Sequence, residues 1–212
     1  MQIVKWHTSR SAQYMRMSSC KHPKACVGLF GFHLFFLFLS CWFLLSVYLA
    51  PYVISHWDVW ELSGDTATIV SGYCREFYAV CQVICHQLPE RSFAVCGVPM
   101  PICVRCLGLT IGTVCATFVG LFLLPQGDLL GILRQYFFLP ENSNPWLLIA
   151  VLLLCAVPMI LDGGSQLIFP YNSPEPLRFV TGLIFGYFRG CILLSVLSVL
   201  LHTAVAKLRR LA

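Results

Sequence analysis

Several cysteines of this chain lie close together in sequence, at spacings suited to metal binding. Cys103 and Cys106 are separated by two residues, and Cys81 and Cys85 by three. Thiolates at these spacings can hold a zinc ion, and His86 could replace one of them. Because Cys85 and His86 are adjacent, we expect only one of the two to bind a given ion. The sequence therefore predicts a metal site, zinc being the candidate ion, at Cys85, His86, Cys103 and Cys106, with Cys81 as a further candidate.

The same cysteines also suit two other arrangements. A C-x-x-C pair at the start of a helix has its thiolate stabilised by the helix dipole, as in disulfide oxidoreductases. A structural disulfide from Cys85 to Cys103 or Cys106 would tie the preceding loop to the helix, and an oxidising compartment would favour it. Reduced thiols with neither role are the third alternative. Cysteine spacing alone does not decide among them.

Polar residues in and around these segments form a second candidate group. The guanidinium groups of Arg91, Arg105 and Arg178 match phosphate or carboxylate in geometry. Asp162 and Gln166 are four residues apart, so a helix would place them on one face. The predicted binding set consists of His86, Gln87, Arg91, Arg105, Asp162, Gln166 and Arg178. We expect an anionic ligand there, such as a lipid headgroup.

The composition identifies the environment in which these residues must act. Of 212 residues, 58% are hydrophobic and 11% charged, and the mean hydropathy is +0.78. Soluble domains carry about 25% charged residues, so an ordinary cytosolic enzyme, a disordered chain and a coiled coil are all excluded. The net charge of +5 comes from basic chain ends rather than one folded face, and we therefore expect no nucleic-acid partner. The chain is predicted to be a membrane protein in contact with lipids.

Four apolar runs are long enough to span a bilayer. They cover about 27–54, 103–124, 146–161 and 179–206. A further segment, about 66–85, repeats apolar residues every three or four positions, but Arg75 and Glu76 at its centre would each cost ~2.5–3.5 kcal/mol in mid-bilayer. We expect this segment to lie at the interface. The predicted fold is an all-α membrane protein with about four transmembrane helices and one amphipathic interfacial helix.

Loop charges predict the orientation and the division of the chain. Residues 1–26 carry five Lys or Arg and no acids, and the tail 207–212 is also basic. The positive-inside rule places both ends in the cytoplasm. The bundle then occupies 27–206, and the loop 55–102 faces outward. We expect a multi-pass protein of the cell membrane, the inner membrane in a bacterium, with all candidate residues at its outer face.

Three motifs give this sequence a family resemblance. Residues 85–93 read CHQLPERSF, residues 103–108 read CVRCLG, and the stretches LDGGSQ and LRFVTG occupy 161–166 and 177–182. In this order they resemble a family of small prokaryotic integral membrane proteins of unknown function. The resemblance covers roughly 85–186, and Leu107 departs from the small hydroxyl residue expected there. It implies a membrane protein and assigns no activity.

The residues are compatible with three classes of function. The main expectation is a binding protein, in which the cysteines and His86 hold a metal or disulfide that shapes a site for an anionic lipid or small solute. An alternative is a membrane enzyme, carrying out thiol–disulfide exchange or metal-assisted hydrolysis of a lipid-linked substrate with Asp162 as the base. A transporter is the third and least favoured class, because many transporters contain an internal repeat and none is visible in this sequence.

Overall fold

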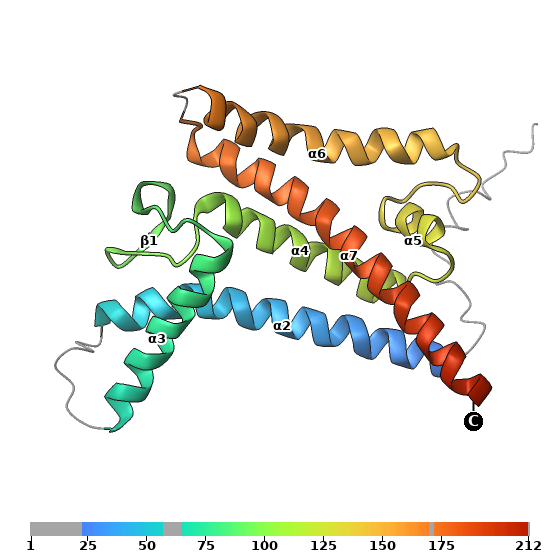
Figure 1. Ribbon diagram of the computed structural model, residues 1–212, viewed down its shortest axis with the longest axis horizontal. Helices are drawn as coiled ribbons and strands as arrows, with labels where there is room; N and C mark the ends of the chain where they lie inside the picture. Colours follow the sequence, from blue (N-terminus) through green and yellow to red (C-terminus); the bar gives the residue numbers. More distant parts are fainter. Residues whose placement is uncertain (1–22, 57–64, 170–171, 212) are drawn as a thin grey trace, which may run out of the picture.

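A computed structural model describes residues 23–56, 65–169 and 172–211, and helices dominate all three stretches (Figure 1). The helices are α2 (Pro23–His56), α3 (Asp65–Ile84), α4 (Val104–Leu123), α5 (Leu129–Tyr136), α6 (Pro145–Ile168) and α7 (Glu175–Leu211). Between α3 and α4 the chain forms a short 3-10 helix, η1 (Pro89–Arg91), and a small hairpin of β1 (Ala94–Val95) and β2 (Val98–Pro99). The predicted all-α class is confirmed.

Four of these helices are long and apolar enough to cross a membrane, as predicted. Their spanning parts are Val27–His56, Val104–Leu123, Pro145–Gln166 and Glu175–Leu201. At about 1.5 Å per residue, even a 20-residue helix reaches across the hydrocarbon layer. The third span continues past the expected end near residue 161, although Asp162 and two glycines interrupt its apolar run. Asp162 and Gln166 therefore lie on a helix.

The two ends of the bundle are formed by different parts of the chain. The beginning of α2 and the end of α7 lie at one end, whereas β1, part of α3, the end of α6 and the start of α7 lie at the other (Figure 1). The start of α4 lies at this second end, because α4 follows the hairpin directly. All three sequence motifs thus converge on the end of the bundle opposite the chain's described termini.

Glycines bring α4 and α7 into backbone contact. Gly108 and Gly112 on α4 face the carbonyl oxygens of Phe179 and Leu183, and Gly186 on α7 faces that of Leu109. A Cβ atom at any of these glycines would collide with the opposing backbone. Small residues at four-residue intervals are a common device for helix association in membranes. The close contact fixes the start of α4 against the start of α7.

Helix α5 was not predicted, because two turns between two membrane spans give too short a pattern to recognise. Its Ile132, Leu133 and Tyr136 are buried in a core shared with α4, α6 and α7. The Tyr136 hydroxyl lies 3.1 Å from the Nε2 atom of His33 on α2. This contact joins α5 to the first span at the end of the bundle opposite the cysteines.

Candidate functional site

The chain leaves α3 through a turn that a glutamine side chain holds in place. Cys85 continues the last turn of α3, with its backbone N–H bonded to the carbonyl of Cys81 at 2.9 Å. Gln87 follows with φ of 51°. Its side-chain amide donates to the carbonyls of Tyr78, at 2.7 Å, and of Pro101, at 2.9 Å. The amide therefore joins the end of α3 to the residues just before α4.

A tight hairpin returns the chain to the start of α4. Its two turn residues, Cys96 and Gly97, both have positive φ, 49° and 83°, as a type I′ turn requires. Cys96 is exposed at the tip. The hairpin ends at Met100, whose N–H bonds to the carbonyl of Phe93 at 2.7 Å. Three residues later Cys103 becomes the N-cap of α4.

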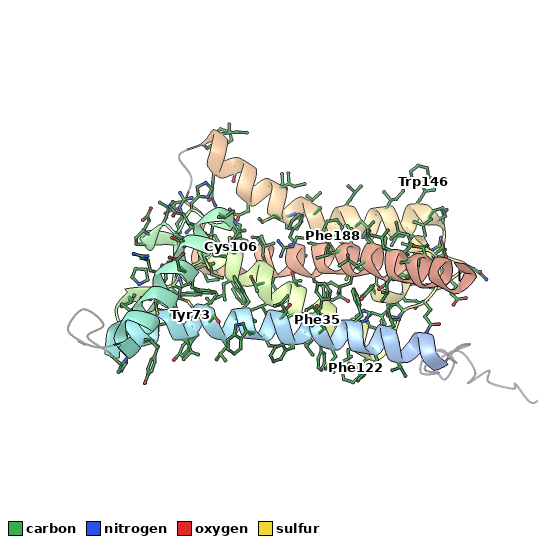
Figure 2. The ribbon with its side chains drawn as sticks, turned by 60° about the horizontal axis from the view of Figure 1, so that its bottom comes forward. Phe35, Tyr73, Cys106, Phe122, Trp146 and Phe188 are labelled. Carbon is green, nitrogen blue, oxygen red and sulfur yellow. The ribbon has the colours of Figure 1, made fainter. Side chains whose placement is uncertain are left out.

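Three cysteines meet where α3 ends and α4 begins, and we call Cys85, Cys103 and Cys106 the thiol cluster. Their sulfur atoms all lie within 4.8 Å of one another. Figure 2 places Cys106 at this end of the bundle and Phe122, far along α4, towards the other. Sulfurs bound to one tetrahedral zinc ion are about 3.8 Å apart at a Zn–S length of about 2.3 Å. The cluster could close on such an ion with small side-chain movements.

Hydrogen bonds lower the pKa of the Cys85 thiol. The thiols of Cys103 and Cys106 hold the pKa of Cys85 far below its ordinary value. The backbone N–H of Cys103 also donates to the Cys85 sulfur, at 3.1 Å. An N–H at a helix start carries partial positive charge and favours a thiolate. Deprotonated sulfur is the form that binds metals and attacks disulfides.

Two further residues predicted as metal ligands lie outside this cluster. His86 has an exposed side chain, and Cys81 is fully buried on α3 beneath the loop. Burial raises the pKa of Cys81 to about 11. Among the residues that the structure describes, the group with metal-ligand geometry consists of the three cysteines alone. Three protein ligands leave a fourth tetrahedral position for another group.

A charged pair lies beside the thiol cluster. Arg105 is one residue before Cys106, and its Nη2 atom donates to the Oδ2 atom of Asp162 on α6. Only 5% of the Asp162 side chain and 18% of the Arg105 side chain is exposed. A buried charge is tolerated when it is paired and hydrogen-bonded. The first turn of α4 thus presents thiols through Cys103 and Cys106 and a guanidinium through Arg105.

Polar contacts continue from this pair to the start of α7. Gln166, one turn after Asp162, donates to its Oδ1 atom at 3.5 Å and also to the Ser173 hydroxyl. Arg178 donates through Nε to the same hydroxyl, at 3.1 Å, and through Nη2 to the side-chain oxygen of Asn172. We call this group the polar cluster: Arg105, Asp162, Gln166, Asn172, Ser173, Arg178 and Thr181, whose hydroxyl lies 3.4 Å from Asp162 Oδ2.

The structure brings four of the seven predicted binding residues into direct or shared contact. These are Arg105, Asp162, Gln166 and Arg178. The other three lie in the loop after α3. Gln87 is occupied by backbone carbonyls, His86 is exposed, and Arg91 is half-buried with an Nε atom that has no partner in the described stretches.

Sequence reasoning missed Asn172, Ser173 and Thr181. Asn172 and Ser173 stand in the short connection before α7, and such residues usually shape turns. Thr181 belongs to the LRFVTG motif, three residues after Arg178. On a helix this spacing places the two side chains on one face, so the sequence could have predicted that Thr181 lies near Arg178. The sequence also shows glycines four residues apart in both α4 and α7. This spacing could have predicted that the two helices pack together, with Arg105 beside α7.

Comparison with known proteins connects this end of the molecule to a family. Residues 85–192, just over half of the chain, match the family described as "Predicted membrane protein (DUF2085)". The chain belongs to this family. The part matched to DUF2085 begins at Cys85 and ends on α7, so it contains the whole thiol cluster and the whole polar cluster. Helices α2 and α3 precede it.

The chain is also similar to two archaeal proteins. The chain is 34% identical over 145 residues to an uncharacterized protein of Methanocaldococcus jannaschii, covering 68% of this chain and 79% of the relative. It is also 34% identical over 103 residues to an uncharacterized protein of Methanothermobacter thermautotrophicus, covering 49% of this chain and 78% of the relative. No solved structure matches the chain.

Proposed function

We propose that this DUF2085 protein binds a metal ion through its thiol cluster, and that the metal shapes an adjacent site for an anionic lipid or small solute. The observation that carries the proposal is the meeting of Cys85, Cys103 and Cys106, with sulfurs within 4.8 Å of one another. Zinc is one of the metal ions that thiolates favour, and it accepts them in a tetrahedral site. It would fasten the loop after α3 to the first turn of α4.

The location of the site follows from loop charges. In sequence, the basic segment 1–26 leads into α2 and the basic tail 207–212 closes α7. The start of α2 and the end of α7 lie at the end of the bundle opposite the thiol cluster (Figure 1). Basic flanks favour the cytoplasmic side. We therefore propose that both chain ends are cytoplasmic and that the thiol cluster faces outward from the cell membrane. Lipids surround the bundle on its apolar faces.

The charge balance of the polar cluster supports an anionic ligand. Arg105 and Arg178 contribute two positive charges, and Asp162 contributes one negative charge. Arg178 is 4% exposed, and within the described residues no carboxylate comes within ion-pair distance of it. Burial of an unpaired guanidinium is costly. A ligand with negative charge would remove that cost.

Metal analysis of the purified protein tests the proposal. We expect about one zinc per chain after purification in chelator-free detergent, and a large loss of zinc in Cys103→Ser and in Cys106→Ser. Cys115→Ser is the matched control, because Cys115 is an exposed residue farther along α4. Absence of stoichiometric metal in wild-type protein, or unchanged zinc in the two cluster variants, would overturn the metal site.

Thiol–disulfide exchange is the second candidate, favoured by the acidic Cys85 sulfur and its backbone N–H donor. In that case Cys85 would exchange with a disulfide of a partner, and Cys103 or Cys106 would release the partner by forming a disulfide with Cys85. Thiol counting in protein purified without reductant separates the candidates. Two thiols lost per chain, with no zinc bound, would favour a disulfide, structural or exchangeable, over metal binding.

Two remaining alternatives have weaker support from the structure. Metal-assisted hydrolysis needs a base beside the metal, and its candidate Asp162 is instead bonded to Arg105. A transporter of the common repeat type would have broken membrane helices, whereas α4 and α6 are continuous helices over 104–123 and 145–168. We therefore keep metal and anion binding as the proposed function.

A further inference from the structure

The polar cluster has an excess of hydrogen-bond donors at Ser173. Two nitrogen donors, Gln166 Nε2 and Arg178 Nε, both point at the Ser173 oxygen. A hydroxyl oxygen that accepts two hydrogen bonds still has one hydrogen of its own to donate. Ser173 is 3% exposed, yet the described part of the chain offers no acceptor for that hydrogen.

The orientation of the Gln166 amide is decided by its neighbour. The Gln166 nitrogen lies 3.5 Å from the Asp162 Oδ1 atom. A carboxylate oxygen can only accept, so the amide must present its NH₂ group there rather than its oxygen. The same NH₂ group then donates to Ser173. The reversed amide, which would give Ser173 an acceptor, would put two oxygens against each other.

Arg178 adds further unused donors. Its Nε and Nη2 atoms each bond to a neutral oxygen, of Ser173 and of Asn172. Its Nη1 atom has no hydrogen bond to any residue in the described ranges. The Asn172 oxygen is occupied by Arg178, which leaves the Asn172 NH₂ group to donate outward. Asn172 is exposed, so the donors border the solvent.

Arg105 contributes to the same imbalance. Its Nη2 atom bonds to Asp162, but its Nε atom is buried without a partner among the residues that the structure describes. Asp162, the one carboxylate of the polar cluster, already accepts from Arg105 and Gln166. Buried donors in folded proteins almost always have acceptors. Within the described residues, the polar cluster therefore has fewer hydrogen-bond acceptors than donors and less negative than positive charge.

We infer that Arg178, Ser173 and Asn172 bind a tetrahedral oxyanion of the phosphate type, presented by a lipid headgroup or as a free ion. Three donor groups on three side chains match an acceptor with three or more oxygens better than a two-oxygen carboxylate. The inference rests on the proposed function, because it names the chemistry of the anion that the site takes. The hydrogen bonds from these three side chains to the anion do not require the metal ion.

Calorimetric titration of the purified protein in phosphate-free detergent tests this inference. The probes are inorganic phosphate, a short-chain phosphatidic acid and acetate. We expect phosphate, phosphatidic acid or both to bind, and acetate to bind at least tenfold more weakly. Arg178→Lys and Ser173→Ala should each weaken binding by about tenfold or more, as loss of a hydrogen bond to a charged partner does.

Arg75→Gln is the matched control, because Arg75 lies exposed on α3 and pairs with Glu76. It should bind the anion as tightly as the wild type. Ser173→Ala keeps the charge of Arg178, so it tests the hydroxyl even if Arg178→Lys fails to fold. Binding of phosphatidic acid alone would identify a lipid headgroup as the ligand, and equal binding of inorganic phosphate would identify a free ion. Either result supports the inference.

Zinc content measured on the same samples separates the two proposals. Acetate that binds as tightly as phosphate would overturn the oxyanion inference. Binding of phosphate by Arg178→Lys and Ser173→Ala as tight as by the wild type would also overturn it. If no anion binds while one zinc per chain remains, the inference fails and the metal site stands. Loss of both anion binding and zinc would refute the proposed function as well.

Discussion

The guanidinium of Arg105, in the first turn of α4, pairs with the carboxylate of Asp162 near the end of α6, fifty-seven positions later in the chain. The pair stands between the two groups of chemical interest. On one side Arg105 is flanked in sequence by Cys103 and Cys106, and on the other Asp162 leads through Gln166 towards Arg178. The ion pair thus links the end of α6 to the same helix turn that presents the thiols.

Removal of one partner from this pair should destabilise the bundle. Asp162→Asn leaves Arg105 largely buried without a counter-charge, and breaking a buried pair costs about 3–5 kcal/mol. We expect a clear fall in the thermal unfolding midpoint of the detergent-solubilised protein. The double variant Arg105→Gln with Asp162→Asn should recover part of that loss. Equal losses in the single and double variants would show that the ion pair is not the cause.

The close contact of α4 and α7 predicts a second effect on stability. In Gly186→Ala the new methyl group would meet the backbone of Leu109, with its Cα atom at 2.7 Å. The helices must separate, at a cost of about 1–3 kcal/mol. Gly31→Ala on α2 is the control, because a Cβ atom there meets nothing within 4 Å. Unfolding midpoints should fall for Gly186→Ala only. A similar fall in both variants would contradict the packing argument.

A buried contact at the opposite end gives a third prediction. His33 donates through Nδ1 to the carbonyl of Leu29, at 2.9 Å, so its Nε2 atom accepts from the Tyr136 hydroxyl. Tyr136→Phe would leave that nitrogen buried and unsatisfied, which costs about 1–3 kcal/mol. Tyr48→Phe, at an exposed position on α2, is the control. A Tyr136→Phe protein as stable as the wild type would show that the contact contributes nothing.

Much of the fold could be predicted, because the length of an apolar run reflects the thickness of the bilayer directly. The missed features depend on tertiary contacts. Helix α6 continues through Asp162 because Arg105 from another helix neutralises the carboxylate, and one sequence segment does not reveal such a partner. Helix α5 is stabilised by burial of Tyr136 and its neighbours rather than by its own short pattern.

The charged residues of the candidate site could be predicted from the sequence. Their neutral partners and the grouping of the side chains in space were harder to predict. Arg105, Asp162 and Arg178 stand out because charge is rare in this chain. Asn172 and Ser173 do not, since polar residues are ordinary in loops. His86 was grouped with the cysteines by sequence adjacency. Its neighbour Cys85 belongs to the group with metal-ligand geometry, and His86 does not.

Metal removal provides a fourth prediction. A strong zinc chelator should increase the alkylation rate of the thiol cluster and lower the unfolding midpoint, because the loop after α3 loses its link to α4. Added zinc should reverse both effects. Cys96 at the hairpin tip is already exposed, so its labelling should not change. Chelator-insensitive labelling of Cys103 and Cys106 would argue that no metal holds them.

Zinc-edge X-ray absorption of the purified protein is the decisive test of metal binding by the thiol cluster, because it reports the atoms bound to the ion. We expect one zinc per chain with a sulfur shell of three atoms at about 2.3 Å and one lighter ligand at about 2.0 Å. The sulfur shell should disappear in a Cys103→Ser, Cys106→Ser double variant. A spectrum with nitrogen or oxygen ligands only, or protein that holds no zinc, would show that the thiol cluster is not a zinc site.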